Sequence, residues 1–208
     1  MFNYLHCKQY LHDYGGSVLS PILGIIASQN YPRITSSYES IQTVNVTSNT
    51  ATISFTSIPS TYKHLQIRYI ARDNAGTAGA DDMYISFNSG ASAQYSWHRL
   101  IGDGASAAAG GAASQSILTV SAAAISRGGY ASGIFSAGII DILDYQNTNK
   151  NTTTRALYGE DRNGAGQMGF GSGLWYGSTN AVTDITFTIE SARSFVQYSQ
   201  FALYGIRG

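Results

Sequence analysis

The stretch Asp184-Ile-Thr-Phe-Thr-Ile-Glu190 alternates polar and apolar residues without a break. In an extended chain Ile185, Phe187 and Ile189 point to one side, and the two threonines between them point to the other. This period of two is typical of an antiparallel strand with one buried face and one face in solvent. The stretch therefore predicts a half-buried strand.

The same alternation recurs along most of the chain, and turn-forming Gly, Asn, Ser and Pro residues separate the runs. The further predicted strands are Ile41–Val46, Thr52–Ser57, His64–Ala71, Met83–Asn88, Tyr95–Ile101, Ser116–Val120, Gly133–Tyr145, Thr152–Tyr158, Gln167–Tyr176 and Tyr198–Ile206. No segment of this part of the chain has the pattern of a long amphipathic helix. Many short antiparallel strands with evenly spaced turns predict an all-β domain, an antiparallel jelly-roll β-sandwich over residues 38–208.

Two glycine-rich segments interrupt the alternation. Gly104–Ser116, which reads GASAAAGGAASQS, has little apolar bulk and is predicted to be a long loop. Gly164–Gly169 has the spacing GxGxxG, but the Gly and Ser residues that follow exclude the helix that a dinucleotide site requires. These glycines predict instead a hairpin whose strands bend or lie against another backbone.

Residues 1–37 differ from the rest of the chain because they show neither helix nor strand periodicity. We predict that they form an extended attachment or assembly arm whose apolar side chains pack on the body or on a neighbouring subunit. These side chains are Tyr4, Leu5, Tyr10, Leu11, Ile22, Leu23, Ile25 and Ile26.

Composition excludes several classes of partner. The 208 residues include 12 Lys+Arg and 12 Asp+Glu, so the formal net charge is zero and no basic surface for nucleic acid or anionic lipid is expected. The longest apolar run, Val18–Ala27, is about half of the ~20 residues that cross a bilayer. The single cysteine, Cys7, forms no intramolecular disulfide and fits assembly in a reducing cytoplasm.

No pattern in the sequence predicts a catalytic or metal centre. Cys7 with its neighbouring histidines lacks the ligand spacing of a structural zinc site, and no GxSxG nucleophile elbow occurs. The adjacent Asp81 and Asp82 point to opposite faces of a strand, as do Asp141 and Asp144. We therefore expect no enzyme activity and no cofactor. A calcium site at Glu160, Asp161 and Asn163 stays open as an alternative.

Aromatic residues are the strongest candidates for binding. Trp97, Tyr130, Trp175 and Tyr176 offer flat amphipathic rings that suit either a protein interface or stacking on a sugar. Composition does not separate these two uses.

Four segments carry a resemblance to a known family. Ile53–Arg68 (ISFTSIPSTYKHLQIR), Ile140–Lys150 (IDILDYQNTNK), Phe170–Trp175 (FGSGLW) and Gln197–Gly208 (QYSQFALYGIRG) resemble, in content and order, a small β-rich virion protein of tailed bacteriophages, notably marine and cyanobacterial phages. The resemblance runs from about Tyr38 to the last residue. The preceding segment resembles the family less, apart from Ile22–Gln29.

The resemblance implies a structural protein of the virion, assembled in the bacterial cytoplasm. Its expected partners are other capsid or tail proteins and copies of itself, in a homotrimer, and its expected role is a head decoration or cement protein or a tail-associated module. The alternative is a receptor-binding fibre tip whose aromatic residues recognise a host surface polysaccharide. The zero net charge and the short apolar run predict neither nucleic-acid binding nor membrane insertion.

Overall fold

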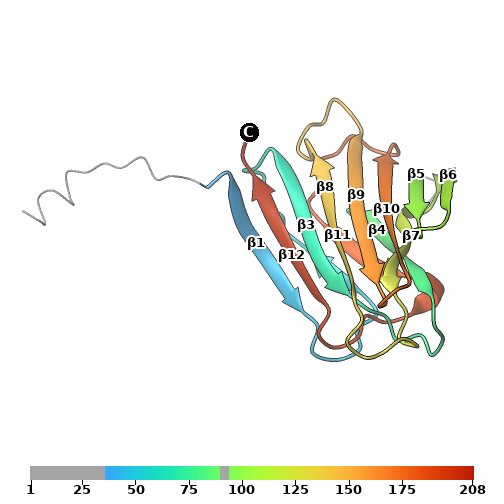
Figure 1. The fold of residues 1–208 in the computed structure, drawn as a ribbon. Helices are drawn as coiled ribbons and strands as arrows, with labels where there is room; N and C mark the ends of the chain where they lie inside the picture. Colours follow the sequence, from blue (N-terminus) through green and yellow to red (C-terminus); the bar gives the residue numbers. More distant parts are fainter. Residues whose placement is uncertain (1–35, 90–93) are drawn as a thin grey trace, which may run out of the picture. The chain divides into compact units, whose positions relative to one another are not determined.

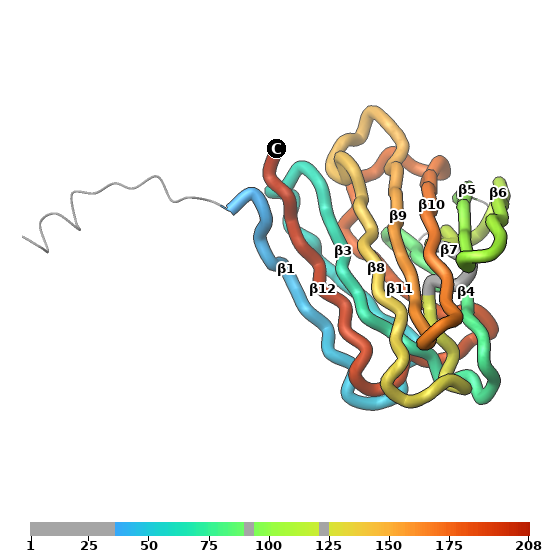
Figure 2. Tube along the Cα trace, in the orientation of Figure 1, coloured from blue at the N-terminus to red at the C-terminus, as the bar shows by residue number. Residues whose placement is uncertain are grey.

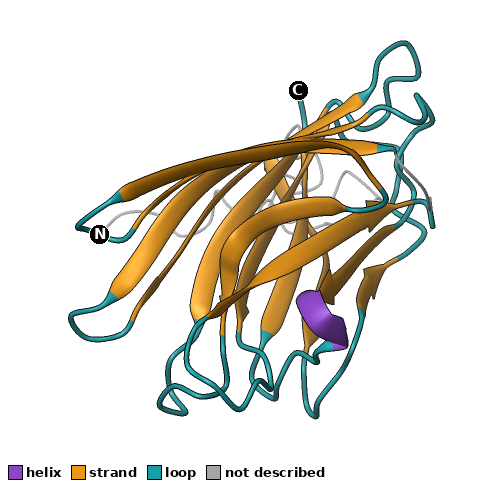
Figure 3. Ribbon diagram, turned by 90° about the vertical axis from the view of Figure 1, so that its right-hand side faces the viewer, coloured by secondary structure: helices purple, strands orange, loops and turns teal. Residues whose placement is uncertain are grey.

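The computed structural model describes residues 36–89 and 94–208, with residues 121–124 described by their backbone alone. The predicted arm residues Tyr4 to Ile26 lie outside the described residues. The described chain forms twelve strands, in the order β1 (Tyr38–Asn45), β2 (Ile53–Phe55), β3 (His64–Ala71), β4 (Ala80–Phe87), β5 (Tyr95–Gly102), β6 (Ala107–Gln115), β7 (Leu118–Ser126), β8 (Ser136–Leu143), β9 (Thr152–Asp161), β10 (Gly166–Trp175), β11 (Ile185–Ile189) and β12 (Gln200–Ile206). Within the described residues a 3₁₀ turn, η2 (Glu190–Ala192), follows β11 and is the purple segment of Figure 3.

The strands form two sheets in which every neighbouring pair is antiparallel. The larger sheet has eight strands in the order β1-β12-β3-β8-β9-β10-β5-β6, which Figure 1 shows from left to right. The smaller sheet has the order β2-β11-β4-β7. The protein is therefore an all-β antiparallel sandwich, and residues 37–208 make one compact unit.

The core lies between the two sheets, and β11 is built as its alternation predicts. Ile185, Phe187 and Ile189 are buried, with Thr186 and Thr188 on the other side of the strand. Phe187 packs against Phe201 of β12, in the larger sheet, with ring centroids 5.3 Å apart. Apolar contacts between alternate residues of the two sheets thus hold the sandwich together.

The last strand of the chain lies inside the larger sheet. β12 pairs with β1 on one side and with β3 on the other, as the red tube between the blue and cyan tubes of Figure 2 shows. Its Phe201 and Leu203 are fully buried. The larger sheet is therefore completed only by residues at the C-terminal end of the chain.

The prediction of a loop at Gly104–Ser116 is wrong, because Ala107–Gln115 forms β6. This strand pairs with β5, and Ala109 lies opposite Leu100. Alanine and glycine carry no alternation that a sequence pattern could reveal, and both are depleted in strands. Backbone pairing with β5 determines this element.

The observed bounds of some strands also differ from the predicted bounds. β7 runs to Ser126, beyond the predicted end at Val120, and β8 is shorter than the predicted Gly133–Tyr145. The predicted glycine hairpin is confirmed: β9 and β10 pair along their whole length. A Cβ atom at Gly171 of β10 would lie 2.5 Å from the carbonyl oxygen of Val120, so this glycine allows β7 to approach β10 closely.

Candidate interaction surface

A row of large apolar side chains crosses the outer face of the larger sheet. Leu100 of β5 lies opposite Phe170 of β10, Phe170 lies opposite Leu157 of β9, and Leu157 lies opposite Ile139 of β8. Their exposed fractions are 51%, 55%, 44% and 36% respectively. We call these four residues the apolar row.

A flanking row lies next to the apolar row, one pleat away along the strands. It combines the exposed Met168 and Ile70 with the small residues Gly102, Gly159 and Ala137, and neighbouring members are again paired across the strands. Met168 and Ile70 are 54% and 44% exposed. The flanking row thus extends the apolar surface beyond the apolar row.

A polar row lies on the other side of the apolar row. Its members, His98, Ser172, Arg155, Asp141 and Gln66, are cross-strand neighbours in that order. Arg155 Nε donates to Asp141 Oδ2 over 2.9 Å, and Gln66 Nε2 donates to Asp141 Oδ1 over 2.9 Å. The Asp141 carboxylate is therefore already satisfied by groups of the same sheet.

The polar row continues into an aromatic contact at β3. Arg68 Nε donates to Gln66 Oε1 over 3.0 Å, and its guanidinium lies over the ring of Tyr204, 5.4 Å from the centroid. Gln66 Nε2 also donates to the Tyr38 hydroxyl over 3.1 Å. These contacts fix the orientation of the polar side chains and leave their charges locally paired.

The apolar and polar rows together border an open depression of about 660 Å³. The inner face of the same sheet is already covered by the sandwich core, whereas an antiparallel sheet with one solvated face normally carries polar residues there. Contiguous exposed apolar surfaces of this kind are typical of interaction sites. The arrangement supplies contact area and orientation, and it contains no paired nucleophile and base.

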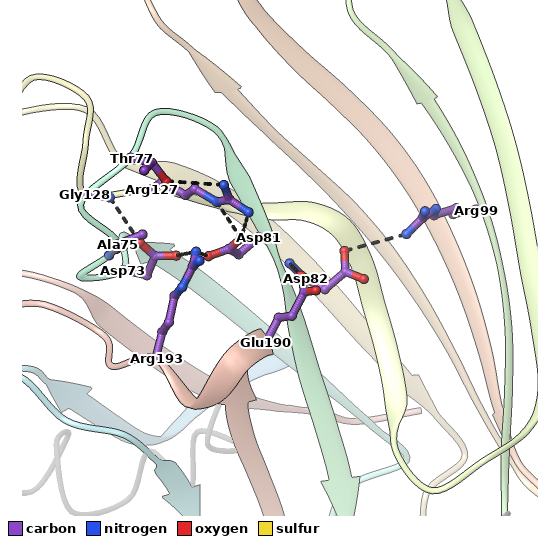
Figure 4. Close-up of polar contacts among 10 residues, drawn as sticks. All are labelled: Asp73, Ala75, Thr77, Asp81, Asp82, Arg99, Arg127, Gly128, Glu190 and Arg193. Carbon is purple, nitrogen blue, oxygen red and sulfur yellow. Dashed lines mark hydrogen bonds and ion pairs between the residues drawn. The ribbon is translucent and has the colours of Figure 1, made fainter.

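A second polar cluster lies at the beginning of β4 and in the neighbouring loops, and Figure 4 shows its members. The buried carboxylate of Asp81 accepts hydrogen bonds from Arg127 Nε over 2.6 Å and from Arg193 Nη1. The buried Asp73 Oδ1 accepts from the backbone N–H of Gly128 over 3.0 Å. Two carboxylates and two guanidinium groups balance, so this network fastens loops together and offers no unpaired charge to a ligand.

The two predicted tryptophans lie on the inner side of the larger sheet. Trp175 is 3% exposed, stacks on Tyr95, and donates from Nε1 to Gln94 Oε1 over 3.2 Å. The expectation that it serves as a binding ring is wrong for this chain, because the period-two pattern does not reveal which face of β10 is buried. Trp97 is half-buried against the core, with the Arg99 guanidinium 4.9 Å from its ring.

The two predicted tyrosines lie at opposite ends of the strands. Tyr130 lies in the loop before β8, where the Arg162 guanidinium covers its ring at 4.7 Å. Tyr176 follows the last residue of β10 and is 38% exposed. The four candidate aromatics therefore do not gather into one sugar-binding cluster.

The residues of the calcium alternative are not arranged as one ligand set. The Glu160 side chain is buried and accepts a hydrogen bond from Gln167 Nε2 over 3.2 Å, whereas Asp161 points to the opposite face and accepts from the Asn163 N–H over 2.8 Å. Within residues 36–89 and 94–208 no three His, Cys, Asp or Glu side chains are placed to hold a metal ion. In the same ranges no helix has the length and apolar character to cross a bilayer.

The two carboxylate pairs also lie apart, as predicted. Asp81 faces inward from β4, and Asp82 on the other side of that strand faces Arg99 Nη1 at 3.6 Å. Asp141 belongs to the polar row, while Asp144 follows β8 and binds Lys63 Nζ at 2.5 Å. Neither pair spans a cleft in the way that glycoside hydrolysis requires.

No family model, curated protein or solved structure matches this chain. Sequence reasoning missed the apolar row, although all four of its residues lie inside or next to predicted strands. The available signal was the alternation of Met168 and Phe170 with glycines, which places bulk on one face of the strand without saying which face is outside.

Proposed function

We propose that this protein is a structural component of a tailed-phage virion, in which residues 38–208 form a jelly-roll module and residues 1–37 attach it to other virion proteins. The four segments that resemble the phage family support the virion role. The protein acts by packing against other proteins of the particle.

The order of the strands supports the jelly-roll topology. Without the hairpins β5–β6 and β9–β10, the larger sheet has the order β1-β12-β3-β8 and the smaller sheet has the order β2-β11-β4-β7. Along the chain, these eight strands alternate between the two sheets. The exception is β4, which is followed by β7 of the same smaller sheet. Eight antiparallel strands wound in this way form two Greek keys, which is the jelly-roll arrangement. The two extra hairpins widen one sheet and carry most of the apolar row.

The apolar row is the observation that carries the assembly role in this proposal. A protein that acts by assembly needs a contiguous surface that leaves water when its partner docks, and this face has one. The chain's zero net charge imposes no long-range repulsion between neighbouring copies in a particle.

Quantitative mass spectrometry of purified virions tests the role. We expect the protein in the particles, and its ratio to the major capsid protein distinguishes a head decoration from a tail module present in a few copies. A Leu157→Asp variant should be incorporated poorly, whereas Ser54→Asp, an equal charge change on the exposed face of β2, should be incorporated normally. Absence of the parent protein from virions would overturn the proposal.

A further inference from the structure

We propose that the outer face of the larger sheet binds the same face of a second copy, about a two-fold axis that runs parallel to the strands between β9 and β10. This inference rests on the proposed function in that it names the partner of the proposed assembly surface. The axis places β10 over β9 of the partner, β5 over β8, and β6 over β3. The order β3-β8-β9-β10-β5-β6 makes these six strands symmetric about that line.

The apolar row complements itself under this axis. A rotation about the strand direction keeps each residue at its level along the strand. Phe170 of one copy therefore faces Leu157 of the other, and Leu100 faces Ile139, because the four residues are in cross-strand register. All four exposed apolar side chains thus obtain apolar partners, and each contact is made twice.

The flanking row complements itself in size. Met168 on β10 faces Gly159 on β9 of the partner, so a long side chain meets a residue without one. Ile70 on β3 faces Ala107 on β6, which is also small. Large side chains opposite small ones allow two sheets to interdigitate, as in the core of a β-sandwich.

The same axis gives a reason for the small residues of β6. Ala109 and Gly111 point outward from this strand, next to the outward Leu100 and His98 of β5. In the paired arrangement Ala109 faces the partner's β3 at Arg68, which is long and points outward, whereas His98 of the same copy fills the space over Gly111. The small Ala109 on this edge strand leaves the space that the long Arg68 side chain needs.

The polar row is complementary in its hydrogen-bonding groups. His98 on β5 faces Asp141 on β8 of the partner, and Ser172 on β10 faces Arg155 on β9. An imidazole opposite a carboxylate, and a hydroxyl opposite a guanidinium, are compatible donor and acceptor pairs. No carboxylate of the row meets a second carboxylate, so like-charge repulsion does not oppose this register.

The area is sufficient for a stable pair. Six strands with five spacings of about 4.8 Å, each contributing eight residues at about 3.4 Å, cover roughly 650 Å² of sheet on each copy. This is close to the ~800 Å² per partner of a standard protein interface. A second copy therefore complements the outer face of the larger sheet in shape, in polarity and in contact area.

The test uses the full chain and measures its association by analytical ultracentrifugation. We expect a dimer, and we expect Leu100→Arg and Ile139→Glu each to raise the dimer dissociation constant at least about 30-fold, because each places a charge in the apolar centre. The two positions are three strand spacings apart within a chain, about 14 Å, so an arginine and a glutamate there do not pair in one copy. Ser54→Asp, on the other sheet, should leave the constant unchanged.

Mixing the two variants tests the axis itself. In a mixed dimer the new arginine of the L100R chain faces the new glutamate of the I139E chain, and heterodimers should form with an affinity near that of the parent. A mixture that stays monomeric, a parent that is monomeric at about 0.1 mM, or a trimer would each overturn the proposal. If a variant fails to fold, oxidative cross-linking of an L100C chain to an I139C chain, both in a Cys7→Ser background, gives the same test.

The outcomes for the two proposals are separable. A dimer that is absent from purified virions contradicts the virion role and leaves the pairing intact. A virion protein that is monomeric in solution and gives no cross-link contradicts the pairing and leaves the virion role intact.

Discussion

Arg72, which is 6% exposed, binds four backbone carbonyl groups of a single loop. Its Nη2 donates to the carbonyls of Gly128 and Tyr130, both over 2.5 Å, and its Nη1 donates to those of Ala131 and Ile134. A planar guanidinium has donors pointing in several fixed directions, so a single side chain reaches all four oxygens. Arg72 therefore shapes the loop between β7 and β8.

We expect Arg72→Ala to lower the free energy of unfolding by about 3 kcal/mol or more, because it removes charged hydrogen bonds and leaves buried carbonyls without donors. Arg72→Lys should recover only a small part, since one ammonium group cannot span the carbonyls. Urea unfolding measures both. Arg207→Ala, which breaks an exposed pair with Glu39, is the control and should cost no more than about 1 kcal/mol. Equal effects for the Arg72→Ala variant and the control would contradict this role.

Asp144 is held by two lysines directly after β8. Lys150 and Lys63 bind its two carboxylate oxygens, and Asn147 Nδ2 donates to Oδ2 over 3.0 Å. These hydrogen bonds, that of Lys150 first, lower the pKa of Asp144 well below its ordinary value. The ionised carboxylate thus favours the folded state.

The stabilisation by Asp144 depends on pH with a defined sign. Because its pKa is lower in the folded chain, the contribution is complete above the unfolded pKa of about 3.9 and is lost as the pH falls toward the folded pKa. We expect the parent to be more stable than Asp144→Asn at pH 7 and the difference to shrink below about pH 4. Asparagine suits the comparison because it tolerates the positive φ of 53° at this position. Thermal melts of both chains from neutral to strongly acidic pH measure the difference, and a gap that widens on acidification would contradict the assignment.

At the scale of elements, the two faces of β10 make different contacts. Its outward Phe170 belongs to the apolar row, while its inward glycines face the smaller sheet and neighbouring side chains. A Cβ at Gly171 would lie 2.5 Å from the Val120 carbonyl oxygen, which belongs to the backbone of β7 and has little room to move. The strand's glycines therefore set the distance between the sheets.

We expect Gly171→Ala to lower the free energy of unfolding by about 1–3 kcal/mol through overpacking against β7. Gly76→Ala is the matched control, because a Cβ at Gly76 meets no atom within 4 Å. The control should change stability by no more than about 0.5 kcal/mol. Urea denaturation of the two variants decides the matter, and a Gly171→Ala chain as stable as the control would show that β7 is not held at this distance.

The sequence predicts a strand where the alternation of its side chains determines the structure, and it fails where backbone pairing or tertiary packing does. β11 is predicted because Ile185, Phe187 and Ile189 alternate strictly with polar residues. β6 is missed because alanine and glycine show no alternation, and only pairing with β5 makes them a strand. The outer apolar row is missed for a related reason: period two groups Phe170 with other residues of its face, but tertiary packing determines which face is covered.

At the scale of the whole molecule, the first and last strands of the sandwich, β1 and β12, lie next to each other in the larger sheet. The Arg207 N–H donates to the Ser37 carbonyl over 3.1 Å, and β1 pairs with β12. The first residue that these contacts require is Ser37, which directly precedes β1. Folding of the sandwich therefore needs both ends of residues 37–208.

Deleting residues 1–36 tests whether folding and attachment belong to different parts of the chain. Because β1 keeps its pairing with β12, we expect the truncated chain to melt cooperatively within about 4 °C of the parent, a shift that corresponds to roughly 1 kcal/mol. Under the proposed function the same chain should be lost from virions, as measured by mass spectrometry against the major capsid protein. The Ser54→Asp full chain is the control for incorporation. A truncated chain that still joins virions at the parent's copy number would place attachment on the sandwich itself, and the outer face of the larger sheet would then be the surface that holds it in the particle.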